Sequence, residues 1–134
     1  MSSQQRRHFL FTFGLAMLVS HELDAIVVAE WRLLPLLNLL PDETAHMVFL
    51  ALHVPVLAGL FWLTAFSSPR CRYRSQLVFD AFLIGHAGVH GLMSGHTLYM
   101  FDSWLSHTLI YGAAIVGTVH LILAWRAGQT PAGV

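Results

Sequence analysis

Helical spacing places a histidine and two carboxylates close together near the start of the chain. His21 and Asp24 are separated by three positions, so on a helix they share a face and can touch each other or one ligand. Glu22 lies about 100° further round, where it supports that pair or faces a neighbouring helix. Apolar residues flank the segment on both sides. Because ionisable groups at bilayer depth normally face a bundle interior, we expect these side chains to pair, bind an ion or do chemistry.

The later part of the chain adds histidines at spacings that suit metal binding. His86 and His90 are four positions apart and share one helix face, which is the spacing of paired ligands in helical metalloenzymes. His53 precedes Pro55, whose ring removes a backbone hydrogen bond and loosens the helix beside the histidine. His107 lies near the start of the last apolar segment. These histidines can join the first group only if helices bring them to the same depth.

The elements that must position these side chains are predicted to be membrane-spanning helices. The chain is 56% hydrophobic and only 10% charged. A soluble domain usually carries about 25% charged residues, so this chain lacks the polar surface that water requires. Four apolar segments are long enough to cross a hydrocarbon core of about 30 Å. We therefore predict an all-α, polytopic integral membrane four-helix bundle that forms one domain over residues 1–134, with helices at residues 9–31, 45–66, 76–98 and 104–125.

The placement of the arginines predicts how the bundle is oriented. The chain has no lysine, and six of its seven arginines lie before the first segment, between the second and third, or after the fourth. By the positive-inside rule both termini are then cytoplasmic, and the protein is a multi-pass protein of the bacterial inner membrane. Glu30, Trp31 and Arg32 are expected at the outer interface, with the tryptophan as an anchor. The net charge of zero leaves no basic face, which argues against a nucleic-acid partner.

The predicted topology shows whether the polar groups can meet. Counted inwards from the outer helix ends at about 1.5 Å per residue, five of them fall in one layer of the outer half of the membrane: Asp24 at about 10 Å, His90 at about 12 Å, His53 at about 13 Å, His21 at about 15 Å and His86 at about 18 Å. The fourth helix reaches this layer through His107, at about 6 Å. Asp80 and His120 both fall about 25 Å down, and we expect them to form a separate pair.

The residue types in this layer indicate a metal centre. Histidine with carboxylate, and no cysteine within the membrane, is a ligand set for zinc, iron or manganese. Such an ion would support hydrolytic or oxidative chemistry on a lipid-like substrate that enters from the bilayer or the outer surface, with Glu22 as the catalytic general base. We predict a divalent metal, zinc or iron, bound by His21, Asp24, His53, His86, His90 and His107.

Three other functions are compatible with the same residues. A b-type haem protein that transfers electrons would use two histidines on facing helices, and the glycines around His86 and His90 suit a flat macrocycle. A metal or proton transporter would extend the polar path through Asp80 and His120, and at four helices it would need to form a homo-oligomer. A structural membrane subunit would use the His/Asp layer only as a hydrogen-bond network, each bond worth about 1 kcal/mol.

Residues 21–25, His-Glu-Leu-Asp-Ala, followed by Glu-Trp at positions 30 and 31, resemble a family signature. A group of small bacterial integral membrane proteins carries the pattern His-Glu-(Ile/Leu)-Asp-Ala…Glu-Trp in its first helix. The function of that group is not known, so the resemblance implies a small polytopic membrane protein and no particular activity. It points to the residues that carry the signature: His21, Glu22, Asp24 and Glu30.

Overall fold

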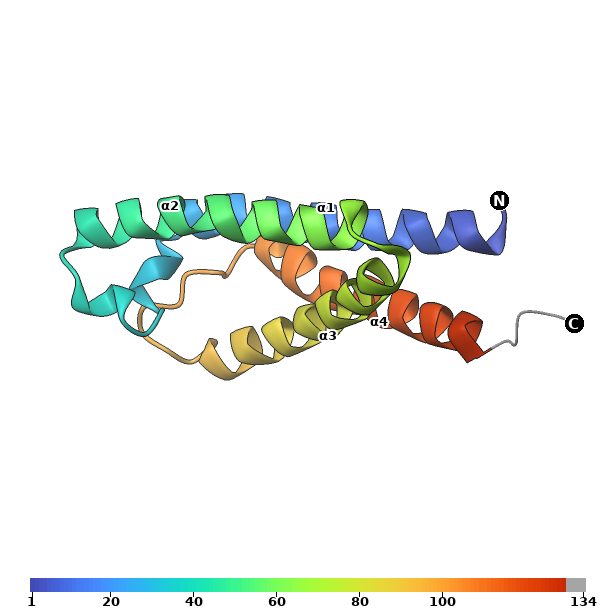
Figure 1. Ribbon diagram of the computed structural model, residues 1–134. Helices are drawn as coiled ribbons and strands as arrows, with labels where there is room; N and C mark the ends of the chain where they lie inside the picture. The colour runs from blue at the N-terminus through green and yellow to red at the C-terminus, as the bar shows by residue number, and fades with distance from the viewer. Residues whose placement is uncertain (130–134) are drawn as a thin grey trace, which may run out of the picture.

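The computed structural model describes residues 1–129 and shows four long helices joined by short segments (Figure 1). The described part of the chain contains no strand, which confirms the all-α prediction. The short elements are two 3₁₀ turns and one π-helical turn. In chain order the elements are α1 (Ser3–Val27), η1 (Glu30–Arg32), η2 (Leu37–Leu39), α2 (Asp42–Phe61), η3 (Trp62–Phe66), α3 (Pro69–Met93) and α4 (Trp104–Gln129).

All four helices differ in at least one bound from those expected, and local backbone chemistry explains the differences in α1 and α3. The helix expected over residues 9–31 ends at Val27, because Ala29 adopts a left-handed conformation with φ of 57° and starts the turn η1. The helix expected over residues 76–98 begins at Pro69, where Ser68 accepts a hydrogen bond from the Cys71 amide, and ends at Met93. Its first turns carry arginines, which an apolar-segment search leaves out.

Three of the four helices are long and apolar enough to cross a membrane: Ser3–Val27, Asp42–Phe66 and Trp104–Ala127, with mean hydropathies of 1.5, 2.0 and 1.7. These helices are compatible with a membrane helical bundle. The remaining helix, α3, has 25 residues but includes Asp80 and two histidines, which lower its hydropathy. Its crossing of the bilayer remains a prediction. The N-terminus and the C-terminal end of α4 lie at the same end of the molecule as the connection between α2 and α3 (Figure 1).

Helix α4 forms the centre of the packed part, since both α1 and α3 pack against it. Glycines on α4 allow the close approach. A Cβ added at Gly112 would lie 2.5 Å from the terminal methyl of Met17, and one at Gly117 would lie 3.1 Å from Leu83 Cδ1. The side chains around these contacts form a buried apolar cluster of Phe11, Met17, Leu18, Phe79, Leu83 and Ala113.

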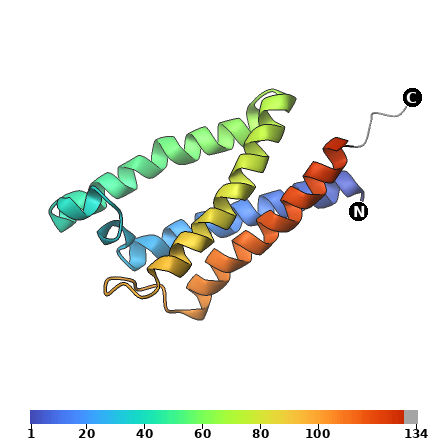
Figure 2. The same cartoon turned by 90° about the horizontal axis from the view of Figure 1, so that it is seen from below.

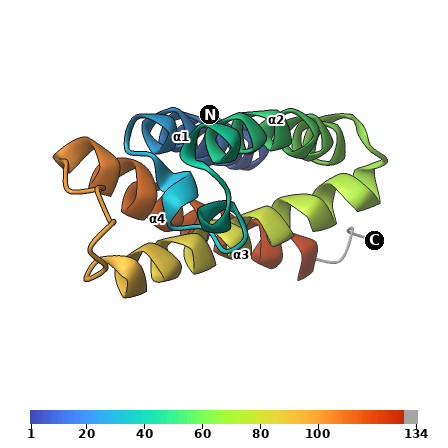
Figure 3. The ribbon, with the colours of Figure 1, turned by 90° about the vertical axis from the view of Figure 1, so that its left-hand side faces the viewer.

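Helix α2 stands apart from this core. Figures 1 and 3 show α1 and α2 in one layer and α3 and α4 in the other, and Figure 2 shows α1 and α2 diverging while α3 crosses between their ends. Only Ala45 and Phe49 of α2 are buried. At its start α2 is tied to η1, because Asp42 accepts hydrogen bonds from Trp31 Nε1 at 3.0 Å and from the Arg32 guanidinium at 2.7 and 2.8 Å. The middle of α2, from His53 to Leu60, lines a cavity that also contacts α1 and α3.

Candidate metal centre

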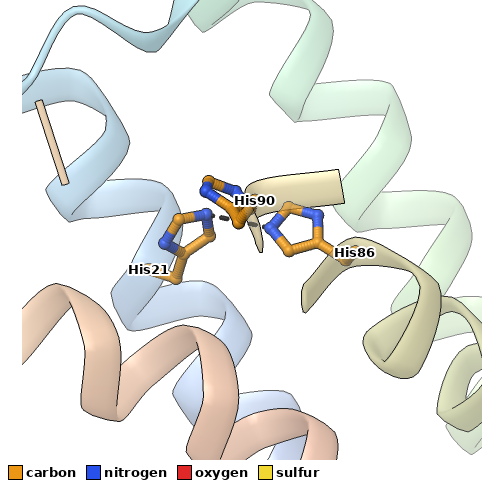
Figure 4. Close-up of side chains that lie close together, drawn as sticks. All are labelled: His21, His86 and His90. Atoms are coloured by element: carbon orange, nitrogen blue, oxygen red, sulfur yellow. Dashed lines mark hydrogen bonds between the residues drawn. The ribbon is translucent and has the colours of Figure 1, made fainter. Parts of the chain in front are cut away.

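Three histidines from two helices form a compact cluster that could hold a metal ion. His21 comes from α1, and His86 and His90 come from one face of α3 (Figure 4). One ring nitrogen of each lies within 4.8 Å of the others, and the Nε2 atoms of His21 and His86 are 3.0 Å apart. Two nitrogens bound to one ion at about 2.1 Å, at right or tetrahedral angles, would stand roughly 3.0–3.4 Å apart. The spacing of the imidazoles therefore fits a shared metal ion.

The cluster is shielded from its surroundings. His21 is 1% exposed and His90 is 4% exposed, while His86 is half-buried. The ring of Phe101 packs against the first two, with centroid distances of 5.2 and 4.8 Å. The three imidazoles also lie against one another, with centroids 4.5–5.0 Å apart. A site this enclosed strengthens electrostatic interactions between its ligands and a cation.

Glu30 adds a carboxylate to the cluster. The left-handed Ala29 turns the chain after α1, and Glu30 Oε1 then lies 3.5 Å from His90 Nε2. Burial raises the pKa of Glu30, but the contact with His90 and the other two imidazoles outweighs it, so the pKa lies below its ordinary value. Glu30 is therefore an ionised group beside three histidines, which is a suitable ligand for a divalent cation.

Tyr99, in the connection between α3 and α4, orients His90. Its hydroxyl lies 3.3 Å from His90 Nδ1, and burial raises the pKa of Tyr99 to about 12, which keeps the phenol protonated. If the phenol oxygen accepts a hydrogen bond from Nδ1–H, the Nε2 lone pair of His90 is free. Metal-binding histidines commonly have this arrangement, in which a neighbouring acceptor holds the second ring nitrogen.

His21 has bonding capacity that the described residues do not use. Its Nδ1 atom is buried and has no hydrogen-bond partner among them. The contact between the Nε2 atoms of His21 and His86 can hold only one proton between two neutral rings. Buried polar groups are normally satisfied, so an incomplete network of this kind is typical of a site that accepts an additional group.

The structure does not bring three of the predicted ligands into this cluster. Asp24 accepts a 2.6 Å hydrogen bond from Ser106 Oγ, which ties α1 to the start of α4. His107 follows Ser106, points away from it round the helix, and packs its exposed ring against Tyr111 at 5.8 Å. His53, the third, bonds to Glu22. The depth of a residue in the membrane does not decide which way its side chain points. These three residues lie at depths similar to that of the histidine cluster, but their side chains point elsewhere.

Glu22 and His53 form a separate pair that bridges α1 and α2. His53 Nδ1 donates to the backbone carbonyl of Phe49 at 2.7 Å, so its Nε2 is the atom that faces Glu22 Oε2, also at 2.7 Å. One proton therefore lies between the two side chains, and the pair can exist as imidazolium with carboxylate or as two neutral groups. The pair lines two adjoining cavities of about 470 and 220 Å³. A pair of this kind can give or take a proton.

The predicted pairing of Asp80 with His120 is confirmed. Asp80 Oδ2 lies 2.6 Å from His120 Nδ1, and the two residues are 1% and 3% exposed. The Phe11 ring packs on the imidazole at 5.4 Å. Neither residue belongs to the cluster of His21, His86 and His90, so the pair is a separate polar site.

Sequence reasoning missed two residues of the site. Glu30 was expected at the outer interface because it adjoins Trp31 and Arg32, and the turn at Ala29 that redirects it has no glycine to mark it. The one available signal was that Glu30 belongs to the signature in the first segment. No sequence feature marked Tyr99 as a site residue, because it lies in the connection between α3 and α4, whose path depends on how these helices pack.

The fold and the site together define a helical protein with membrane-compatible helices and a buried histidine cluster that could hold a metal ion. A family model matches residues 7–127, and the chain belongs to that family, which is described as a family of unknown function (DUF6713). No curated protein matches the chain. No solved structure matches it either.

Proposed function

We propose that this protein is a membrane-embedded metal-binding protein of the bacterial inner membrane, and that it acts as a metalloenzyme on a lipid-like substrate. The observation that carries the proposal is the convergence of His21, His86 and His90, from two helices, within 4.8 Å. The ionised Glu30 completes a set of three nitrogen ligands and one oxygen ligand. Zinc and iron both accept such a set.

The ligand number bears on the kind of chemistry. Three histidines leave a fourth position open on tetrahedral zinc, which is the arrangement of catalytic zinc sites, whereas binding by Glu30 as well would close that position. Iron, with up to six ligands, keeps open positions in both cases. An open position would let the ion polarise a substrate oxygen or activate water.

Glu22 is the residue we propose as the catalytic base. It lines the smaller cavity together with His86 and Glu30, so a substrate that reaches the histidine cluster through this cavity passes the carboxylate. The hydrogen bond to His53 provides an exchangeable proton at the same point. A group that can take a proton from water or substrate and pass it to a neighbour meets the requirement for general acid–base catalysis.

The cavities favour an apolar substrate. Both are lined mainly by leucine, valine and phenylalanine side chains, and both lie beside α2, on the side where that helix stands away from the core. A substrate could therefore enter sideways from the hydrocarbon region. The nearest competing function is a structural hydrogen-bond network, which the 3.0 Å contact between His21 and His86 favours. Haem fits less well, because imidazoles in direct contact leave no space for a macrocycle between them.

Metal analysis of the purified protein tests the proposal. We expect about one zinc or iron ion per chain, lost in His86→Ala and retained in the matched control His107→Ala, whose ring lies outside the cluster. A Soret band in the visible spectrum would instead indicate haem. Wild-type protein that stays folded and monodisperse but takes up neither zinc nor iron after loading would show that the cluster is only a structural network.

A further inference from the structure

The larger cavity, here called the slot, lies between α1, α2 and α3 and is lined by residues of all three helices and of η3. It has a volume of about 470 Å³, within the range of about 300–1,000 Å³ that small-molecule sites occupy. Along α2 and η3 it extends from His53 to Thr64, and along α3 from Phe82 to Arg74. Eleven residues of helix correspond to roughly 16 Å, about half of a hydrocarbon core of ~30 Å. The slot is therefore about as long as one lipid chain in one leaflet.

The charges at the two ends of the slot differ. Arg74 and Ser75 line the end near Thr64, while Glu22 and His53 line the other. No ion pair among the described residues includes Arg74, and its side chain is exposed. Between the ends the lining is aliphatic or aromatic. An elongated molecule with one anionic end and an apolar body matches this distribution of charge.

A single arginine with a hydroxyl beside it favours a monoanion over a dianion. The guanidinium fork binds a carboxylate through two parallel hydrogen bonds, and one positive charge neutralises one negative charge. We propose that the slot binds a long-chain carboxylic acid, with its carboxylate on Arg74 and its chain between α2 and α3. The inference rests on the proposed function only in making this acid the substrate, because the binding itself needs no metal.

The orientation of the chain follows from the adjoining cavity. The smaller cavity shares Glu22, His53 and Val56 with the slot and continues to His86 and Glu30. With the carboxylate on Arg74, the end of the chain farthest from the carboxylate lies beside the histidine cluster. The metal centre would then act on the distal part of the chain and not on the carboxyl group.

A binding experiment in lipid nanodiscs tests the assignment. The protein is reconstituted in zwitterionic phosphatidylcholine, and binding of radiolabelled palmitic acid and hexadecanol is measured at pH 8, with empty nanodiscs as background. We expect palmitic acid to bind more tightly than hexadecanol. Arg74→Gln should weaken palmitic acid binding about tenfold and leave hexadecanol unchanged. Arg70→Gln, at the same end of α3 but outside the slot, is the matched control and should bind like the wild type.

A second pair of variants tests the slot itself. Leu57→Trp places a large ring in the slot and should abolish palmitic acid binding, whereas Val54→Trp adds the same ring to an exposed position of the same helix that does not line the slot. Equal binding of acid and alcohol by the wild type, or equal loss in Arg70→Gln and Arg74→Gln, would show annular lipid only. Tighter binding of hexadecyl phosphate than of palmitic acid would also overturn the assignment.

Metal content measured on the same samples separates this inference from the proposed function. Wild-type protein that carries its ion but does not bind palmitic acid would refute the ligand and leave the metal centre intact. Protein that binds palmitic acid without taking up metal would support the slot and refute the metalloenzyme.

Discussion

The Nε2 atoms of His21 and His86 lie 3.0 Å apart, although 65 positions separate the two residues in the chain. At this distance the two nitrogens can share either a proton or a metal ion. A metal ion requires both lone pairs, so loading displaces the shared proton and metal affinity rises with pH. The neighbours that orient the rings therefore decide how well an ion competes.

Tyr99→Phe is expected to weaken metal binding without removing it. The substitution deletes the hydroxyl that holds His90 Nδ1 and leaves every proposed ligand in place. Loss of such a supporting partner typically lowers metal affinity by about 10–100-fold. Competition with a chromophoric zinc chelator measures the change. Tyr111→Phe, on α4 beside His107, is the control, and equal affinities for the two variants would show that Tyr99 does not support the site.

Glu30→Gln is expected to lower metal affinity more than Asp24→Asn does. The first substitution removes the ionised oxygen beside His90, whereas the second alters a carboxylate that Ser106 engages away from the cluster. We expect a loss of at least tenfold for Glu30→Gln and little change for Asp24→Asn, measured by the same chelator competition. The opposite order would place Asp24 in the site and Glu30 outside it.

The bond between Glu22 and His53 should appear as a coupling energy. In a double-mutant cycle of Glu22→Leu and His53→Leu, either substitution alone removes the hydrogen bond, so the double variant should be little less stable than each single one. We expect a coupling of about 1–2 kcal/mol, in the upper range for hydrogen bonds inside membranes. Unfolding in mixed detergent micelles provides the stabilities. Full additivity would mean that the two side chains do not interact in the folded protein.

The same two substitutions should leave metal content unchanged. The proposed role of Glu22 is to move protons and not to bind the ion. Loss of stoichiometric metal in Glu22→Leu would instead make this carboxylate a ligand.

Asp80 and His120 are expected to contribute to the stability of the folded protein. Replacing one of them alone should destabilise the protein more than replacing both. Asp80→Leu leaves a buried imidazole without its acceptor, and breaking a buried pair in this way costs about 3–5 kcal/mol. The double variant Asp80→Leu/His120→Phe replaces both groups with apolar ones beside Phe11 and should recover much of that loss. Thermal unfolding gives the comparison. A double variant less stable than both single ones would show that the pair has a role beyond mutual neutralisation.

Gly117→Ala is expected to loosen the contact between α3 and α4. The added methyl would lie 3.1 Å from Leu83 Cδ1, and this side chain is buried in the packed core, where it has little room to move aside. We expect a loss of roughly 1–2 kcal/mol, typical of overpacking. Gly59→Ala is the matched control, since no atom lies within 4 Å of its added methyl and alanine has the higher helix propensity. Equal stability of the two variants would contradict the close approach.

Physical reasons separate the parts of the structure that could be predicted from those that could not. The four helices and the two histidines on α3 follow from hydropathy and from the spacing of four residues along one turn. The depth of each polar group follows from the helical rise, and it correctly paired Asp80 with His120. A depth calculated from the helical rise gives no information about the rotation of each helix about its own axis. For this reason Asp24 and His107, at suitable depths, are directed to Ser106 and Tyr111 and not to the histidine cluster.

The left-handed turn at Ala29 could not be predicted from the pattern of apolar residues. It depends on the backbone conformation of an alanine, a residue that rarely has positive φ, and Glu30 follows this turn and lies beside His90. The connection that carries Tyr99 is similarly set by how α3 and α4 pack. The residues that support the histidine cluster, Glu30 and Tyr99, could therefore be located only from the three-dimensional structure.

All three clustered histidines belong to α1 and α3, and α2 contributes none. An ion held by these rings would link α1 directly to α3, whereas α2 would remain attached through hydrogen bonds, those of His53 with Glu22 and of Asp42 with Trp31 and Arg32. Metal binding would therefore restrain α1 and α3 more than α2. The two sides of the slot would then differ in rigidity, with the α2 side the more mobile one.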